Sequence, residues 1–162
     1  MSNFCPVKTG LLEVLKIIIS TQTRYAIRFL LELSNSEEKD KPVTLRQIAK
    51  QQGISEAYLE SIATKLRKNG YLRSFKGAGG GYCLNTNIDD ITVGEIMRLM
   101  ETTYFQVHCI PDAKSCCDNY GRCELARGWE LLQSSIDNMV DNIKLSQLST
   151  NHPDMLLDPV NP

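Results

Sequence analysis

Two short amphipathic segments, joined through Gly53, constrain the fold of this chain more than any other feature of its sequence. Thr44 can cap the first helix, with Gln47 as its reciprocal partner in a capping box, and Gly53 ends it because a tight turn needs a residue that tolerates a positive φ. Ser55 then caps a second helix, which Gly70 ends. So short a turn between two helices is typical of a helix-turn-helix, although a helical hairpin in a bundle has the same pattern. The apolar residues at helical spacing are Leu45, Ile48 and Ala49, then Tyr58, Leu59, Ile62, Ala63 and Leu66.

A glycine-rich hairpin follows the second helix and favours the helix-turn-helix. Residues 71–75 and 82–84 have the composition of strands, with a glycine-rich run between them. A strand, a glycine loop and a second strand in this place are typical of the wing of a winged helix. Glycines such as Gly79 and Gly80 let the backbone of a wing tip approach a phosphate or enter a minor groove. A plain flexible hairpin is the alternative, whereas a nucleotide-binding loop would need a following Lys-Ser/Thr and a surrounding βαβ unit.

Three further helices are expected around this unit. The apolar spacing predicts helices over residues 20–34 and 93–101. A longer helical pattern covers residues 124–148, and its apolar stripe continues from Leu125 to Ile143. So long a stripe is hard to bury within one small chain, which predicts a dimer helix, with packing across its own domain as the alternative. We therefore expect a mainly helical fold, a winged helix-turn-helix with a small two-stranded wing and a long C-terminal dimerisation helix.

The charge of the chain is unevenly distributed, although its formal net charge is only −1. Residues 43–82 carry seven basic and two acidic side chains, whereas residues 83–162 carry five basic and twelve acidic ones. The basic half coincides with the expected helix-turn-helix and wing, where Lys65 and Lys76 can neutralise DNA phosphates. The distribution therefore favours double-stranded DNA as a partner, although the net charge alone would not.

Several classes of protein do not fit the sequence. No segment is apolar over the roughly 18 residues that a membrane span needs, and residues 1–16 lack a signal-peptide core. The two histidines form no recognisable acid–base pair, so we expect neither an enzyme nor a small-molecule substrate. We expect a cytoplasmic protein without membrane contact. Its expected parts are an N-terminal appendage (1–16), the DNA-binding domain (17–101), a cysteine segment with the dimerisation helix (102–148) and a disordered tail (149–162).

The cysteines are clustered. Four of the six lie within 15 residues of one another: Cys109, Cys116, Cys117 and Cys123. Their spacing lacks the two-residue gaps that dominate zinc fingers. Thiolates on an irregular loop are the usual ligands of iron–sulfur clusters, which need four ligands. A redox disulfide or a zinc site is the alternative. The separate Cys5 and Cys83 are expected to be a tail thiol and a packed side chain of the wing.

Taken together, these segments resemble a family of winged-helix transcription regulators that includes IscR, NsrR and CymR. The resemblance covers most of the chain, from about Ile19 to Leu148. It is carried by residues 23–26 (TRYA), 52–60 (QGISEAYLE), 66–70 (LRKNG), 77–82 (GAGGGY) and 91–96 (ITVGEI), followed by the cysteine segment and Trp129.

The resemblance implies a homodimer with two DNA-binding domains and a crossed pair of long helices. It implies that Ser55, Tyr58 and Ser61 of the second helix contact operator DNA. A wing residue matching Lys76 also contacts the operator in these relatives. Glu60 matches a position that tunes the choice of DNA site in the IscR branch.

The resemblance also implies an iron–sulfur cluster, for which 2Fe–2S is favoured over 4Fe–4S. Cys109, Cys117 and Cys123 match the three cysteine ligands of the IscR branch. The fourth ligand of that branch, a histidine, is replaced by Ala126, and Arg24 aligns with the carboxylate that the NsrR branch takes from the partner chain. The fourth ligand therefore stays open among Cys116, Glu124 and a group of the partner chain.

The function expected from these observations is a DNA-binding transcription regulator whose operator affinity is controlled by an iron–sulfur cluster in residues 109–123. Two alternatives are kept. The first is a metal-free regulator that switches through disulfides of Cys116, Cys117 or Cys123. The second is a winged-helix module that a partner protein controls.

Overall fold

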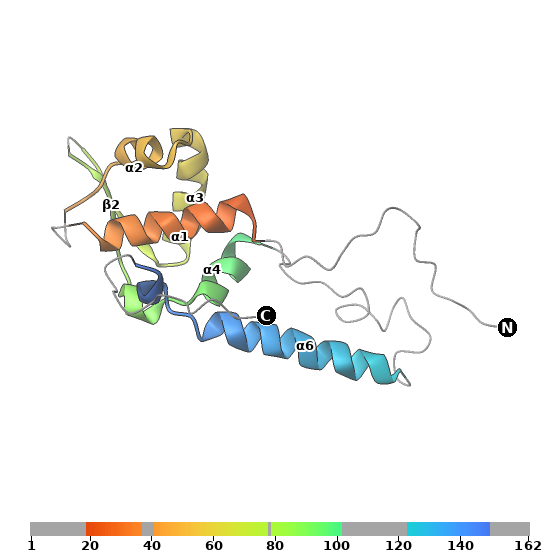
Figure 1. Cartoon of the computed structure of the whole chain (residues 1–162). Coiled ribbons are helices and arrows are strands. Elements are labelled where there is room, and N and C mark those ends of the chain that lie inside the picture. Colours follow the sequence, from red (N-terminus) through yellow and green to blue (C-terminus); the bar gives the residue numbers. More distant parts are fainter. Residues whose placement is uncertain (1–18, 37–40, 78, 102–122, 150–162) are drawn as a thin grey trace, which may run out of the picture.

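The structure, a computed structural model, describes residues 19–36, 41–77, 79–101 and 123–149. These residues form a mainly helical winged helix-turn-helix from which one long helix extends (Figure 1). The expected appendage, most of the cysteine segment and all of the expected tail except Ser149 lie outside the described residues. The elements are α1 (Thr21–Ser34), α2 (Leu45–Gln52), α3 (Glu56–Lys68), β1 (Leu72–Phe75), β2 (Gly81–Leu84), η1 (Ile88–Asp90), α4 (Val93–Met100), α6 (Glu124–Asp141) and η3 (Leu145–Leu148).

Hydroxyl side chains cap the helices of the domain, as the sequence predicts for Thr44 and Ser55. The Ser20 side chain accepts a hydrogen bond from the Thr23 N–H at the start of α1, and Ser55 accepts one from Tyr58 at the start of α3. Thr44 accepts the Gln47 N–H at 3.3 Å. A capping box with both of its hydrogen bonds forms at α4, between Thr92 and the residue three positions on, Glu95. Each cap uses an N–H group that the helix itself leaves unpaired.

The turn between α2 and α3 depends on glycine. Gly53 has a φ of +67°, and its N–H donates to the Ala49 and Lys50 carbonyl groups in the last turn of α2. A side chain at this φ would be strained, so glycine is the residue that allows the helix to end and reverse within three residues. The helix-turn-helix predicted from the sequence is therefore formed by α2 and α3.

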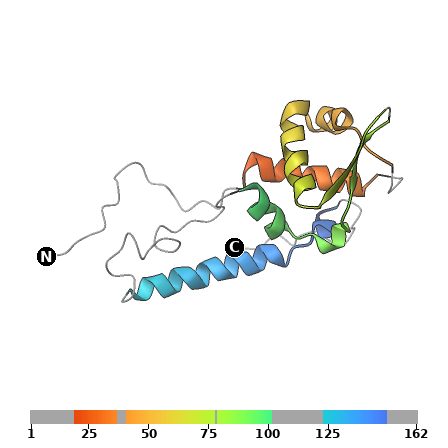
Figure 2. The same cartoon turned by 180° about the vertical axis from the view of Figure 1, so that it is seen from behind.

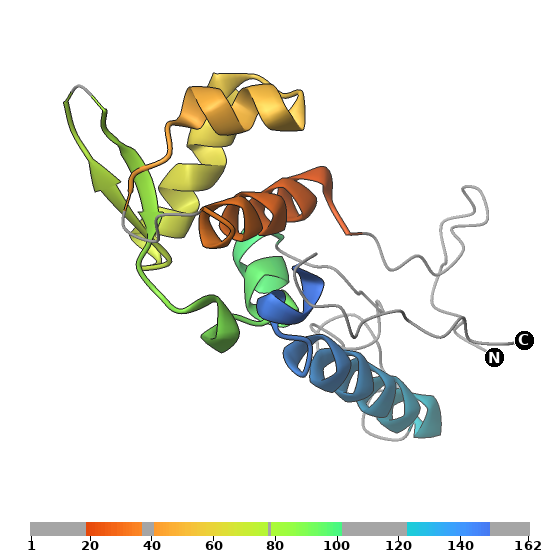
Figure 3. The same ribbon diagram turned by 60° about the vertical axis from the view of Figure 1, so that its left-hand side comes forward.

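The wing is an antiparallel hairpin in which Leu72 pairs with Leu84 and Phe75 with Gly81. The wing projects to one side of α1, α2 and α3 (Figure 3). Val43, just before α2, forms an isolated bridge with Tyr82 and thereby attaches the hairpin to the start of the helix-turn-helix. A side chain at Gly81 would collide with the Val43 backbone, which explains why glycine occupies the first position of β2.

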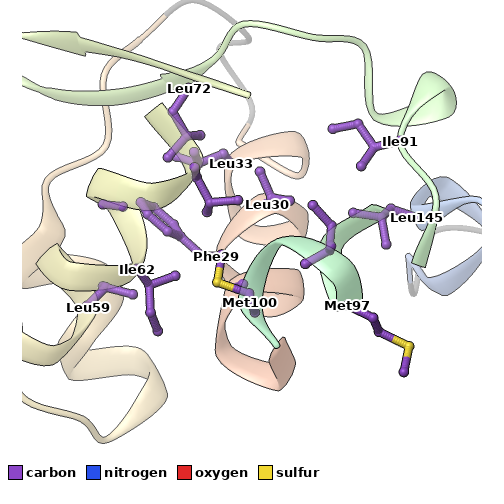
Figure 4. Close-up of a cluster of buried hydrophobic side chains, with 14 of the residues drawn as sticks. Phe29, Leu30, Leu33, Leu59, Ile62, Leu72, Ile91, Met97, Met100 and Leu145 are labelled. Carbon is purple, nitrogen blue, oxygen red and sulfur yellow. The ribbon is translucent and has the colours of Figure 1, made fainter. Parts of the chain in front are cut away.

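One apolar core holds these elements together, and Figure 4 shows part of it. Phe29, Leu30 and Leu33 of α1 pack among residues of α3, β1 and α4. Burial of large apolar side chains such as these is the main stabilising contribution in a domain of this size. Further members of the core are Leu59, Ile62, Leu66, Leu72, Ile91, Ile96, Met97, Met100 and Leu145.

The long helix α6 ends earlier than the sequence pattern indicates. It stops at Asp141 rather than near Leu148, and the chain then turns back to the domain. Val93 donates to the Ile143 carbonyl and Leu145 donates to the Ile91 carbonyl, so this return is paired with the chain before α4. The chain therefore returns to the domain instead of continuing as a helix, because this path forms these backbone hydrogen bonds and buries Leu145 completely.

The C-terminal end of α6 packs closely on α4. A side chain at Gly94 would come within 2.9 Å of Val140 Cγ2, so this glycine permits the close approach of the two helices. Arg98 of α4 donates to Asp141 at 2.5 Å, and this hydrogen bond raises the pKa of Arg98. The other end of α6 extends away from the domain (Figure 2).

Candidate nucleic-acid interface

Helix α3 has one buried and one exposed face. Leu59, Ile62 and Leu66 are fully buried against the core, which fixes the orientation of the helix. On the outer face, the sequence-predicted residues Ser55, Glu60, Ser61 and Lys65 are all exposed. An exposed polar face on the second helix of a helix-turn-helix is the surface that enters a major groove in this motif.

The hydroxyl groups of this face are already oriented by the helix. Ser55 caps α3, so its oxygen lies at the helix N-terminus, where backbone N–H groups point outward. Ser61 donates to the Tyr58 carbonyl at 2.7 Å. The Tyr58 ring is half-buried and packs edge to face on Tyr25 of α1, with ring centroids 6.0 Å apart. Helix α1 thus supports the residues of α3 that the sequence analysis selected.

Lys65 is linked to α1 as well. Its Nζ donates to Oε1 of Gln22, in the first turn of α1, at 3.0 Å. Lys65 belongs to a basic last turn of α3 that also contains Arg67 and Lys68, and all three side chains are exposed. Gln22 could not be predicted from the sequence, because its role depends on a contact between residues 43 positions apart.

The tip of the wing exposes Lys76 and Gly79. Gly79 has a φ of +83°, and a side chain at Gly80 would collide with the Phe75 carbonyl. The tight tip therefore needs both glycines and presents backbone together with a lysine. Phe75 at the end of β1 is 44% exposed, which adds an apolar side chain to this surface.

Helix α2 contributes a further basic side chain, Arg46, which was not among the site residues expected from the sequence. Arg46 Nε lies 3.8 Å from Oε1 of Glu56, the first residue of α3, and both side chains are exposed. An exposed pair at this distance contributes little to stability. Arg46 can therefore turn from Glu56 to another anion at small cost.

Only one of the four clustered cysteines, Cys123, lies among the described residues. It stands at the N-cap position of α6, it is half-buried, and its side chain makes no capping hydrogen bond. Cys109, Cys116 and Cys117 lie outside the described residues. Within the described ranges, no three His, Cys, Asp or Glu side chains gather as a metal site would require. The free sulfur of Cys123 at the start of a helix is compatible with a thiolate ligand.

Helix α6 carries an exposed apolar face along its length. Leu125, Leu132 and Met139 recur every seven residues, and each is exposed, Leu125 and Met139 by more than 60%. Ile136, by contrast, is buried against the domain. A seven-residue apolar repeat on an exposed helix face is typical of helix pairing between chains.

A model of the Rrf2 family, described as an iron-dependent transcriptional regulator, matches residues 19–151. The chain belongs to the Rrf2 family. The resemblance inferred from the sequence is therefore confirmed. Members of the Rrf2 family are transcriptional regulators rather than enzymes, and this chain is therefore a transcriptional regulator as well.

Individual Rrf2 relatives match most of this chain. It is 32% identical to the HTH-type transcriptional regulator IscR of Pectobacterium atrosepticum over 133 residues, which cover 82% of this chain and 79% of that protein. It is 33% identical to IscR of Yersinia pseudotuberculosis, with the same coverage of both chains.

Solved structures of Rrf2 relatives have the same fold. CymR of B. subtilis, described as a global cysteine regulator, is 31% identical and superposes with a TM-score of 0.64 over 83% of this chain and 97% of that one. IscR of T. potens is 32% identical, with a TM-score of 0.60 over 81% and 85% of the two chains. This Rrf2 protein is thus a DNA-binding transcription regulator. Among its described helices, none is both long and apolar enough to cross a membrane.

Proposed function

We propose that this Rrf2 regulator binds operator DNA through α3 and the wing, as a homodimer, under the control of an iron–sulfur cluster. The DNA contacts that we propose are Ser55, Tyr58, Glu60, Ser61 and Lys65 of α3, and Lys76, Gly79 and Gly80 of the wing. The exposed polar face of α3 and the basic, glycine-rich tip of the wing support this assignment. Glu60, the acidic member, would discriminate between bases, since a carboxylate accepts a hydrogen bond from the cytosine amino group.

The dimer would form along the exposed apolar face of α6. Leu125, Leu132 and Met139 lie on this face, and Gly128 and Ser135 lie beside them, also at a spacing of seven. Small residues let a second helix approach closely, while the leucines supply apolar area. A dimer presents two copies of α3, and two-fold sites in DNA have half-sites about 34 Å apart, one helical turn.

The main support for an iron–sulfur cluster is the cysteine segment, which leads directly into α6. Cys109, Cys117 and Cys123 would be three ligands of a 2Fe–2S cluster, with the fourth supplied by Cys116, Glu124 or a partner group. The half-buried sulfur of Cys123 and the description of the family as iron-dependent support this proposal. When bound, such a cluster supplies an oxidant-sensitive centre that holds several thiolates together.

The residues of this chain would transmit the state of that centre in two ways. Cys123 begins α6, the proposed dimer helix, so its position affects how that helix starts. Residue 102, where the segment begins, follows directly after Glu101, which contacts α1. One end of the segment is thus attached to the proposed dimer helix, and the other to a residue that contacts α1, which packs on α3. A coupling free energy of about 1–3 kcal/mol between the two sites is typical of such arrangements.

Anaerobic purification tests this proposal. We expect a coloured protein with iron and sulfide in equal amounts, and single alanine substitutions of Cys109, Cys117 and Cys123 should each remove the colour. The matched substitution Cys83→Ala, at a buried cysteine of β2 outside the segment, should leave the spectrum unchanged. A colourless wild-type protein without iron or sulfide would remove the cluster from the proposal while leaving DNA binding in place.

A second candidate mode of control is a metal-free thiol switch. It is favoured by the solved oxidised form of Staphylococcus aureus CymR, to which this chain is 28% identical. In this mode, a disulfide among Cys116, Cys117 and Cys123 would change DNA affinity. Mass spectrometry of oxidised protein distinguishes the two candidates, because each disulfide removes two hydrogen atoms and requires no iron.

A further inference from the structure

One hydrogen-bond network joins the end of α4 to the beginning of α1. The Oε1 atom of Glu101, the residue just after α4, accepts a hydrogen bond from the Thr23 hydroxyl at 2.5 Å and one from the Ser20 N–H at 2.9 Å. Thr23 is fully buried and Glu101 is partly buried. The two helix ends lie side by side in Figures 1 and 2. A carboxylate that accepts two hydrogen bonds in a partly buried place is a strong attachment point, because charged acceptors form the stronger bonds.

The same turn of α1 holds a residue of α3. Gln22 lies between Ser20 and Thr23 in the sequence, and its side chain accepts the hydrogen bond from Lys65 Nζ. Ser20 is the N-cap of this turn, so Glu101 binds both the cap and the third residue of the helix. Without Glu101, the first turn of α1 would lose two of its anchors, and helix ends that lack such partners fray.

We propose that Glu101 is a positioning residue for DNA binding: its carboxylate fixes the first turn of α1, and that turn orients Lys65 of α3 through Gln22. The inference rests on the proposed phosphate contact of Lys65. A lysine side chain has several rotatable bonds, and fixing it before the DNA arrives reduces the entropy that binding must overcome. Glu101 contacts no DNA in this arrangement and acts only through α1.

The test is a double-mutant cycle on affinity for a DNA duplex that the wild-type protein selects from a random pool. We expect Glu101→Ala to weaken binding about threefold to tenfold, which corresponds to roughly the loss of one oriented contact. In the Lys65→Ala background, Glu101→Ala should weaken binding no further, since the group that it positions is absent. Glu101→Gln keeps an oxygen that can accept both hydrogen bonds and should restore wild-type affinity.

Two controls separate positioning from general stability. Asp141→Asn weakens another hydrogen bond of α4, the one with Arg98, and should leave DNA affinity unchanged. Gln22→Ala removes only an exposed hydrogen bond, so it keeps the fold even if Glu101→Ala does not. We expect Gln22→Ala also to weaken binding alone and to have no effect in the Lys65→Ala background.

The possible failures are distinguishable. Lys65→Ala should reduce the slope of log affinity against log salt by about 1, as the loss of one phosphate contact does. If Lys65→Ala changes neither affinity nor slope, the proposed contact itself is wrong. If Lys65→Ala lowers both affinity and slope, but the effects of Glu101→Ala and Gln22→Ala are additive with it, the positioning role of Glu101 is overturned. The same conclusion follows if Asp141→Asn weakens DNA binding as much as Glu101→Ala.

Discussion

At the scale of single residues, Thr23 contributes to stability in a way that its size does not suggest. Its hydroxyl is fully buried and donates to the Glu101 carboxylate. Thr23→Val keeps the shape but leaves that carboxylate with one donor fewer, so we expect the free energy of unfolding to fall by about 1–3 kcal/mol. Urea unfolding measures this loss. Thr23→Ser keeps the hydroxyl and should lower the free energy of unfolding less than Thr23→Val does. If Thr23→Ser is instead the less stable variant, the contribution of Thr23 comes from packing and not from its hydrogen bond.

Tyr71 predicts a pH dependence of stability at the residue scale. Burial, and secondarily the negative charge of Glu95, raise the pKa of Tyr71 above its ordinary value of 10.0. A raised pKa in the folded state adds stability that is fully present below pH 10 and is lost as the pH rises through the folded-state pKa. Wild-type protein should therefore lose more stability than Tyr71→Phe between about pH 9 and about pH 11. Urea unfolding at the two pH values measures these losses, and equal losses of unfolding free energy in the wild type and in Tyr71→Phe would contradict the prediction.

At the scale of elements, the capping box of α4 determines how this short helix begins. The Thr92 side chain accepts the Glu95 N–H at 3.2 Å, and the Glu95 carboxylate accepts the Thr92 N–H at 2.8 Å. Thr92→Ala removes the first of these bonds and should cost about 0.5–2 kcal/mol. Thermal unfolding followed by circular dichroism measures it. Thr44→Ala, at a cap with one such bond, serves as the comparison and should cost no more than Thr92→Ala.

The elements also show how far the sequence alone could go. Caps, helix faces and the glycine turn were predictable, because each depends on residues within about four positions of one another. The end of α6 was not, because the bonds of Val93 and Leu145 that replace its last turns join residues about fifty positions apart. The same limit applies to the candidate site. The apolar spacing of α3 indicated which face is buried, and the resemblance to known regulators selected the DNA contacts on the other face, whereas Gln22 and Glu101 are linked to that face only in three dimensions.

At the scale of the whole molecule, association through α6 can be tested apart from DNA. Leu132→Lys together with Met139→Lys places two charges on the exposed apolar face, and we expect the proposed dimer to dissociate at concentrations where the wild type does not, because charges are costly to bury at an apolar interface. Analytical ultracentrifugation measures this. Ser134→Lys, on the opposite side of α6, is the matched control and should leave the dimer intact. Unchanged sedimentation of the double variant would place the interface elsewhere.

The uneven attachment of α6 has a consequence for backbone amide exchange. Its C-terminal end is held by Ile136, by Gly94 of α4 and by the paired return of the chain, whereas its first turns have no such support among the described residues. In an isolated protomer, deuterium should enter the hydrogen-bonded amides near Trp129 sooner than those near Asp141. A second chain on the apolar face would slow exchange most at the outer end, so the profile along this one helix reports directly on assembly.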